Sequence, residues 1–245
     1  MDSRNTRLLN TAEAARLLRV SEASIRRWSD SGLLRVARIG RRRERRFNDS
    51  DLLAFGELPP SKRAPIGTVN VGGMAIPVPV HLAPLYSTDE GRLRLTVPFL
   101  AEGIRLGQPG FLVANGPVLA TYLDALGAQA GVDLERAQKE GSFTLVALQG
   151  DGSAAIAQFE RMFGEALATR QTLIRLVGEM ACVRTMFGSE DEMLRFEEAF
   201  EVMFRRYQIA AICQYDVRMF DGPSLLRMLK AHPDLFGLRS GTFFN

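Results

Sequence analysis

The segment from residue 9 to residue 55 holds the pattern that most restricts what this chain can fold into. Two short stretches with helical periodicity follow each other closely, residues 12–18 and residues 22–30, and a small polar residue precedes each of them. Thr11 and Ser21 are of the types that cap helix N-termini. This spacing predicts two short helices joined by a tight turn.

A basic hairpin is expected directly after the second helix. Residues 35–39 and 42–47 predict two short strands that meet at Gly40 and Arg41, and residues 51–55 predict a last short helix. Helix, turn, helix and hairpin in this order make a winged helix-turn-helix. The second helix of such a domain enters the major groove of DNA, and the wing lies on the backbone beside it.

Arginines and serines of the second helix and the hairpin are the expected contacts with double-stranded DNA. Residues 1–63 hold 15 Lys/Arg against 8 Asp/Glu, whereas residues 64–245 hold 16 against 20, so the positive charge is local. Arginine binds guanine bidentately or pins phosphates; the alternative is a solvated charge run. The expected DNA contacts are Ser21, Ser24, Arg26, Arg27, Arg38, Arg41, Arg42, Arg43, Arg45 and Arg46.

A proline-rich stretch separates this part from the rest of the chain. It predicts a linker over residues 59–67, between a DNA-binding domain of residues 1–58 and a larger domain of residues 68–245. After a hairpin over residues 68–80, apolar strands alternate with helices, which predicts a mostly parallel sheet with helices on both faces. The expected strands are residues 110–114, 143–148, 173–177 and 210–215, and the expected helices are residues 89–106, 118–130, 154–169, 191–207 and 224–231.

Composition excludes several classes of protein. Hydrophobic residues make up 46% of the chain and charged residues 24%, which favours a folded, globular chain. No run of about 18 apolar residues occurs, so no membrane partner is expected and the predicted location is cytoplasmic. The two cysteines, Cys182 and Cys213, predict buried small hydrophobes rather than a disulfide framework or a metal site, and no cofactor is expected.

The loop after the strand at residues 110–114 lacks the residues that bind nucleotide phosphates. A phosphate loop needs glycines followed by Lys and Ser/Thr, whereas residues 115–117 are Asn-Gly-Pro. Pro117 also removes a backbone donor. No nucleotide hydrolysis and no enzymatic activity are therefore expected.

The N-terminal motif resembles the winged helix-turn-helix of the MerR and excisionase superfamily. The resemblance lies in residues 11–15, 24–28, 32–34 and 39–41, together with Val20-Ser21. Long-form MerR members continue into a long dimerising helix, whereas prolines follow here. A homodimer is therefore expected to form through the C-terminal domain.

The second domain resembles the methanogen/methylotroph, DcmR-type sensory domain of dichloromethane-response regulators. The resemblance lies in residues 81–86, 99–103, 176–180 and 212–216, with His232-Pro233. It implies a degenerate RecA-like α/β domain that senses small molecules, including hydrocarbon derivatives. The expected protein is a one-component transcriptional regulator whose C-terminal domain senses a small-molecule effector or a partner. The alternatives are an excisionase-like architectural factor and a nucleotide-dependent enzyme that acts on DNA.

An effector pocket is expected at the carboxyl edge of the sheet, where open α/β sheets bind ligands. Glu179 is either a pocket or relic catalytic group or a satisfied carboxylate, and His232 is expected to interact with a helix dipole. The methionines and phenylalanines of residues 180–204 predict core or dimer packing, with an adaptable apolar pocket as the alternative. The expected ligand-binding residues are His81, Tyr86, Asn115, Glu179, Met180, Tyr215 and Asp216, of which the first two either line the pocket or tether the linker.

Overall fold

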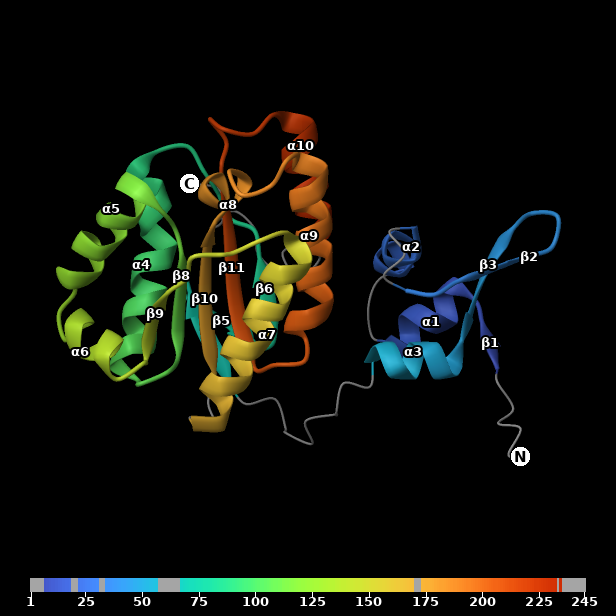
Figure 1. Cartoon of the computed structure of the whole chain (residues 1–245), viewed down its shortest axis with the longest axis horizontal. Helices are drawn as coiled ribbons and strands as arrows, with labels where there is room; N and C mark the ends of the chain where they lie inside the picture. The colour runs from blue at the N-terminus through green and yellow to red at the C-terminus, as the bar shows by residue number, and fades with distance from the viewer. Residues whose placement is uncertain are drawn as a thin grey trace. The chain divides into compact units, whose positions relative to one another are not determined.

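The chain forms two compact units, Met1–Arg63 and Ala64–Asn245, in a computed structural model (Figure 1). The structure describes residues 7–18, 22–30, 34–56, 67–169, 173–232 and 234. The two units are described separately below. The extent of the linker, residues 59–67, stays a prediction.

The N-terminal unit combines three helices with a small antiparallel sheet, which confirms the predicted helix-turn-helix with its hairpin. Its helices are α1 (Thr11–Leu18), α2 (Glu22–Asp30) and α3 (Asp49–Gly56), and its strands are β1 (Leu8–Leu9), β2 (Ala37–Ile39) and β3 (Glu44–Asn48), in the sheet order β1-β3-β2. The side chains that face inward are apolar because the helical periodicity places them on one face. The core consists of Leu9, Ala14, Ala15, Ile25, Trp28, Leu34, Phe47 and Leu52.

Helix α1 is capped by Asn10, so the prediction that Thr11 is the cap was wrong. The Asn10 side-chain oxygen accepts a hydrogen bond from the Glu13 amide at 2.9 Å, and the Glu13 carboxylate accepts one from the Asn10 amide at 2.9 Å. This reciprocal pair is a capping box. Both Asn10 and Thr11 are cap-forming residue types, but only Asn10 has a glutamate three positions later.

The C-terminal unit is built on a sheet in which every strand pair is parallel, which confirms the predicted α/β class with a mostly parallel sheet. The order is β6-β11-β10-β8-β9, and β7 continues beside β11. The central strands are mostly apolar and fully buried because helices cover both faces. The strands are β6 (Val80–Leu82), β7 (Leu85–Tyr86), β8 (Gly110–Val113), β9 (Phe143–Leu145), β10 (Ile174–Glu179) and β11 (Ile209–Asp216).

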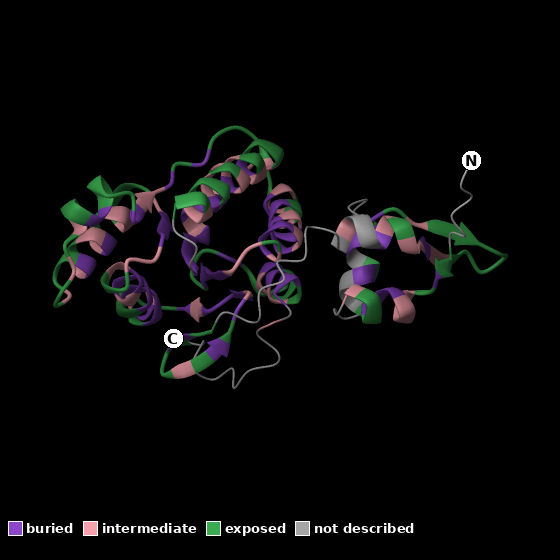
Figure 2. Cartoon of the chain, turned by 90° about the horizontal axis from the view of Figure 1, so that it is seen from below, coloured by how far each residue is buried: buried purple, intermediate pink, exposed green. Residues whose placement is uncertain are grey.

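Helices on the two faces of this sheet enclose two separate hydrophobic cores (Figures 1 and 2). One face is covered by α4 (Asp89–Arg105), α5 (Gly116–Gly127), α6 (Leu134–Lys139) and a hairpin of β4 (Thr68–Val71) and β5 (Met74–Pro77). The other is covered by α7 (Gly152–Thr169), α8 (Met180–Arg184), α9 (Glu190–Phe204) and α10 (Gly222–Ala231). Among the helices that the structure describes, none combines the length and apolarity needed to cross a bilayer.

Four of the elements that the structure describes in this unit were not predicted, namely β6, β7, α6 and α8. The expected second hairpin strand, residues 74–80, ends at Pro77, and β6 starts separately at Val80 as a parallel strand beside β11. Pro77 and Pro79 lack the amide proton that a continuous ladder needs. Helices α6 and α8 have six and five residues, too few to show helical periodicity in the sequence.

Candidate DNA-binding face and buried polar clusters

An open, charged groove lies between the helix-turn-helix and the wing, which we define as β2, β3 and their turn, residues 37–48. Its walls come from the N-terminus of α1, from Glu22 and Arg26 of α2, and from Arg38 and residues 42–46 of the wing. Arg26 is exposed and forms an ion pair with Glu22 at 2.5 Å. The groove therefore brings one predicted contact of α2 together with five wing arginines.

Asp30 at the end of α2 ties the wing to the helix-turn-helix. Arg45 donates to both carboxylate oxygens at 2.7 Å, and Arg38 donates to one of them at 2.8 Å. The hydrogen bond from Arg45 lowers the pKa of Asp30. Exposed ion pairs contribute little to stability singly, but these converge on one carboxylate and so fix the direction of the wing relative to α2.

The structure thus divides the predicted DNA-contacting arginines into two groups. Arg38 and Arg45 hold the wing on Asp30, and Arg46 pairs with Glu44 at 2.7 Å. The arginines of the turn are exposed and form no ion pair within the part of the chain that the structure describes; these are Arg41, Arg42 and Arg43. Three predicted contacts lie outside the described residues, namely Ser21 and the side chains of Ser24 and Arg27.

Strand alternation separates the seven predicted ligand residues instead of joining them in one pocket. Successive side chains of a strand point to opposite faces, so on β11 Cys213 and Tyr215 face the α9 side, whereas Gln214 and Asp216 face the α4 side. Three of the predicted residues lie on the α4 side, namely Tyr86, Glu179 and Asp216. Three others lie on the α9 side, namely His81, Met180 and Tyr215. The seventh, Asn115, is exposed at the start of α5.

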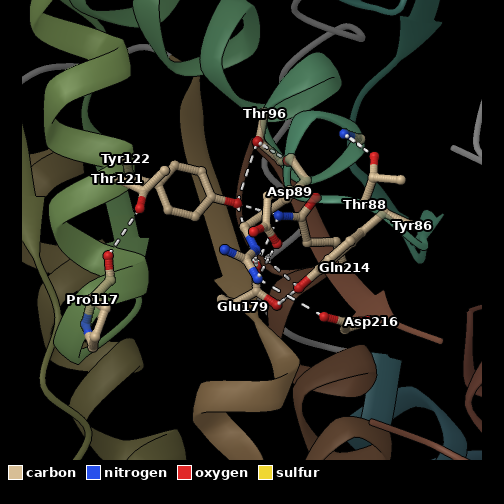
Figure 3. Close-up of polar contacts among 12 residues, drawn as sticks. Tyr86, Thr88, Asp89, Thr96, Pro117, Thr121, Tyr122, Glu179, Gln214 and Asp216 are labelled. Atoms are coloured by element: carbon tan, nitrogen blue, oxygen red, sulfur yellow. Dashed lines mark hydrogen bonds and ion pairs between the residues drawn. The ribbon is translucent and has the colours of Figure 1, made fainter. Parts of the chain in front are cut away.

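Glu179, the last residue of β10, is the centre of a buried polar group that we call the Glu179 cluster (Figure 3). The Tyr86 hydroxyl donates to one carboxylate oxygen at 2.5 Å, and the Gln214 amide donates to the other at 3.0 Å. The Tyr122 hydroxyl lies 3.5 Å from the second oxygen, and Arg92 Nε lies 3.7 Å from it. Four donor side chains thus surround one carboxylate.

Burial sets the protonation of this cluster. It raises the pKa of Glu179 to about 7, against the opposing hydrogen bonds from Tyr86 and Gln214 and the charge of Arg92. Burial, followed by the nearby Glu179 carboxylate, also raises the pKa of Tyr86. Glu179 therefore titrates near neutral pH while both its oxygens are already engaged.

Ion pairs at the rim connect the Glu179 cluster to the surface. Arg92 lies 3.8 Å from Asp216 and 3.2 Å from Asp89. Arg218, which is half exposed, pairs with Asp216 at 2.7 Å and with Asp89 at 2.9 Å. Burial would raise the pKa of Asp216, but hydrogen bonds from Arg218 outweigh it and hold the pKa low.

On the opposite face lies a second buried group, the His81 cluster, formed by His81, Glu197, Cys213 and His232. His81 is 3.1 Å from both the Cys213 sulfur and His232, and His232 is 3.0 Å from Glu197. Burial lowers the pKa of His81, whereas for His232 the contact with Glu197 outweighs burial and raises the pKa. His232 does end α10, as predicted, but its ring belongs to this cluster.

A small apolar cavity of about 10 Å³, room for roughly one water molecule, lies between the sheet and helices α7, α8 and α9. Met180 is the one predicted ligand residue that lines it. Phe196 and Phe200 also line it, and both belong to the hydrophobic core on this face of the sheet, as core packing of the methionine and phenylalanine pattern predicted. The lining residues are Val113, Leu148, Phe159, Leu176, Gly178, Met180, Val183, Phe196, Glu197, Phe200 and Cys213.

Sequence reasoning missed several members of both clusters. Gln214 lies two positions from Asp216 on one strand, so alternation alone places the two side chains on one face. Glu197 and Glu201 occur between Phe196, Phe200 and Phe204 on the buried face of α9, and acidic residues within an apolar stripe are a signal of buried function. Nothing in the sequence pattern singles out Arg92 or Tyr122.

Comparison with known proteins adds two family matches and one relative. Residues 80–233 match the family described as the methanogen/methylotroph, DcmR Sensory domain, and residues 8–57 match a helix-turn-helix domain family. The transcriptional repressor DcmR of Methylorubrum extorquens is 36% identical over 242 residues, which cover 94% of this chain and 91% of that protein.

Among solved structures, a KaiC-like protein of Pyrococcus horikoshii is 16% identical with a TM-score of 0.46, over 64% of this chain and 71% of that one. The flagellar accessory protein FlaH of Methanocaldococcus jannaschii is 8% identical with a TM-score of 0.42, over 67% and 70% of the two chains. The family match covers residues 80–233, and the relative is 36% identical along nearly the whole chain. The chain therefore belongs to the methanogen/methylotroph, DcmR Sensory domain family, and it carries a helix-turn-helix domain before the sensory domain.

Proposed function

We propose that this transcriptional regulator represses genes by binding operator DNA and releases it when a small apolar molecule enters the sensory domain. The observation that carries the DNA-binding part is the Asp30 junction, which holds an arginine-rich wing against α2. Support for repression comes from the 36% identical relative, which is named a transcriptional repressor.

The apolar cavity, rather than the Glu179 cluster, is the proposed effector site. Both oxygens of Glu179 are engaged by Tyr86 and Gln214, so a ligand there would have to break buried hydrogen bonds. The cavity offers an apolar lining that includes Met180 and Phe196, and its volume of about 10 Å³ has to grow by movement of these side chains when an effector binds. Small-molecule sites are lined mostly by apolar side chains and methionine adapts its shape readily, so the hydrocarbon derivatives implied by the family resemblance fit such a lining.

The effector would act by favouring one arrangement of the DNA-binding units. It can shift that equilibrium only by its different affinity for the two states. We propose that the protein is a homodimer through its C-terminal unit, so that two recognition helices reach half-sites about one helical turn apart. Light scattering on the full chain and on residues 64–245 checks this; a dimeric full chain with a strictly monomeric fragment would contradict it.

The effector proposal is tested by narrowing the cavity with one methyl group. A Cβ at Gly178 would lie 3.5 Å from the Cys213 sulfur and 3.6 Å from the Met180 sulfur, which is ordinary contact, so Gly178→Ala fits without displacement. Gly164→Ala is the matched control, because a Cβ there meets nothing within 4 Å. Full-length protein is titrated onto its own upstream DNA, followed by fluorescence anisotropy, with a series of halomethanes and short alkanes.

We expect one or more of these compounds to weaken DNA binding at least tenfold. Gly178→Ala should bind DNA like the wild type but need more effector, whereas Gly164→Ala should respond like the wild type. Equal responses in both variants would remove the cavity as the site, and no response to any compound would contradict an apolar effector.

We also propose that the protein does not hydrolyse nucleotides. Residues 115–117 lack the lysine and hydroxyl of a phosphate loop, and Glu179 is enclosed by protein donors rather than free to activate water. Purified protein should show no ATP or GTP turnover. Turnover that Glu179→Gln abolishes would instead favour the enzyme alternative.

A further inference from the structure

Four side chains of the types that bind metal ions meet on the α9 face of the sheet. His81 comes from β6, Glu197 from α9, Cys213 from β11 and His232 from the end of α10. One donor atom of each lies within 4.8 Å of the others, and all four residues are buried. The proposed DNA binding and effector release do not require these groups to act as a unit.

Both imidazole rings are turned so that their Nε2 atoms face the centre of the His81 cluster. Nδ1 of His232 lies 2.7 Å from the Met228 carbonyl oxygen, which only accepts hydrogen bonds, so Nδ1 carries a proton. Nδ1 of His81 lies 3.0 Å from the Glu201 carboxylate, which favours the same tautomer. Metal-binding histidines are held in this way, by donation of the other ring N–H to a carboxylate or a backbone carbonyl.

The donor atoms are spaced as a tetrahedral metal would space them. Nε2 of His81 lies 3.1 Å from the Cys213 sulfur and 3.1 Å from Nε2 of His232. One Glu197 oxygen lies 3.8 Å from Nε2 of His81 and 3.0 Å from Nε2 of His232. Zinc bond lengths imply edges of roughly 3.3–3.8 Å in a tetrahedron of N, S and O ligands. The four separations above lie within about half an ångström of these edges, and the separations from the Cys213 sulfur to the other two donor atoms are at most 4.8 Å.

The charges around the cluster favour a cation at its centre. Two Nε2 lone pairs that face each other at 3.1 Å repel unless a proton or a metal ion lies between them. Glu197 is a fully buried carboxylate that faces His232 at 3.0 Å and His81 at 3.8 Å, so its charge is balanced only if a proton or a metal ion is held among these groups. The nearby Arg205 is already engaged by Glu201 and by Asp234, so its charge is shared with two other carboxylates.

Aromatic rings surround the cluster. The His81 ring lies 5.1 Å from the Phe200 ring and 5.2 Å from the Phe204 ring, and Tyr215 contacts His232 edge-on at 5.9 Å between ring centroids. Such a site has four protein ligands and no open position, which is the pattern of structural rather than catalytic zinc. It would join β6, the first strand of the sheet, to α9, β11 and the end of α10.

We propose that the His81 cluster binds one zinc ion per chain through His81, Glu197, Cys213 as thiolate and His232. Binding releases the Cys213 proton to solvent, and the two positive charges of the ion balance the thiolate and the Glu197 carboxylate. No metal was expected from the sequence, because it contains only two cysteines. Consecutive ligands are 16 to 116 positions apart along the chain, so their meeting is a property of the fold.

The test uses full-length protein that has been dialysed against a chelator and then titrated with Zn²⁺ or Co²⁺. We expect one ion per chain by elemental analysis, and thiolate-to-cobalt charge transfer with the visible bands of tetrahedral Co²⁺. Zinc at about 100 times its Kd is expected to raise Tm by roughly 5–10 °C. Cys213→Ser should lose the charge-transfer band, whereas Cys182→Ser, the matched control at the other buried cysteine, should keep it.

Several outcomes would overturn the proposal. The first is wild-type protein that binds less than a tenth of an equivalent of either ion with no change in Tm; the cluster would then be a proton-sharing pair of His232 and Glu197. The second is a cobalt spectrum that is the same in Cys213→Ser as in the wild type. Because the wild-type titration needs no variant, a failure of Cys213→Ser to fold leaves the decision to that measurement.

Discussion

The two units of this protein place their charges in opposite ways. The N-terminal unit keeps the arginines that the structure describes at the surface, where Arg41 and Arg43 are exposed and even the anchored Arg45 stays partly accessible. The C-terminal unit buries charged groups on both faces of its sheet, including Arg175 and Glu179 on the α4 side and Glu197 on the α9 side. Substitutions in the first unit should therefore change DNA affinity with little effect on stability, whereas those in the second should change stability and its pH dependence.

The largest effect is expected at Arg175 of β10. Its guanidinium donates to the Phe99 carbonyl oxygen at 2.8 Å and to Gln108 at 2.7 Å, and it pairs with Glu102 at 2.7 Å. Arg175→Met leaves these acceptors without their donor, so the free energy of unfolding should fall by about 3 kcal/mol. Chemical denaturation measures this.

The matched control for that change is Arg94→Met on the exposed side of α4. An exposed arginine of this kind should change the free energy of unfolding by no more than about 0.5 kcal/mol. If Arg175→Met and Arg94→Met lowered the free energy of unfolding equally, burial of the arginine would not explain the loss. The proposed difference in charge placement between the two units would then not determine stability.

The next effect is a pH dependence of stability that originates at Glu179. Its pKa of about 7 in the folded protein lies above the usual 4.5. The folded state therefore holds the proton more tightly than the unfolded state, so the stabilisation is complete below about pH 4.5 and is lost as the pH rises through 7. Between pH 5 and pH 8 this contribution should fall by about 2–3 kcal/mol.

Comparison with Glu179→Gln isolates this contribution, because glutamine does not titrate. The unfolding free energy of each protein is measured at both pH values, and the wild type should lose about 2–3 kcal/mol more than the variant over the interval. If the two pH profiles run parallel, Glu179 is not protonated in the folded protein near neutral pH.

A smaller effect, confined to DNA binding, is expected at Arg26 of α2. The side chain is half exposed and faces the groove between helix and wing. If it contacts a base, Arg26→Ala should cost about 1–3 kcal/mol of operator affinity and leave Tm unchanged. Anisotropy titrations measure the affinity, with Arg161→Ala, an exposed arginine of α7, as control. If Arg26→Ala bound operator DNA as tightly as the wild type, this face of α2 would not contact the DNA.

The smallest effect is expected in the turn of the wing. Arg41 is exposed there, and within the described residues it forms no ion pair, so it is available to a phosphate. Arg41→Ala should weaken binding to all sequences alike and reduce the slope of log affinity against log salt by about 1. An unchanged slope would indicate that the tip does not reach the DNA backbone.

Much of the fold could be predicted because periodicity survives in long elements. The apolar runs that became β8, β10 and β11 were recognised, as were helices α4, α7 and α9, although several bounds moved by a few residues. Short elements were missed, since β6 has three residues between a proline and a turn, and α8 has five. In such elements the tertiary contacts decide the conformation.

The candidate sites were predictable only in part. Glu179 was singled out by its place at the end of a strand. Its environment could not be anticipated, because Tyr86 and Arg92 of β7 and α4 and Tyr122 of α5 all lie far from Glu179 along the chain. Asp30 was not singled out at all, although it orients the wing. Its role depends on two arginines that the hairpin brings back to the end of α2.

The sequence by itself determined the order of elements, the local positive charge and the family, because these depend on neighbouring residues and on periodicity. Tertiary structure alone decided which side chains share a site. Residues 215 and 216 are adjacent in the chain, yet the pleat of β11 sends Tyr215 to one face and Asp216 to the other. His81 and His232, by contrast, lie 151 positions apart and meet at 3.1 Å, because the parallel sheet aligns β6 beside β11 and α10 packs over their common face.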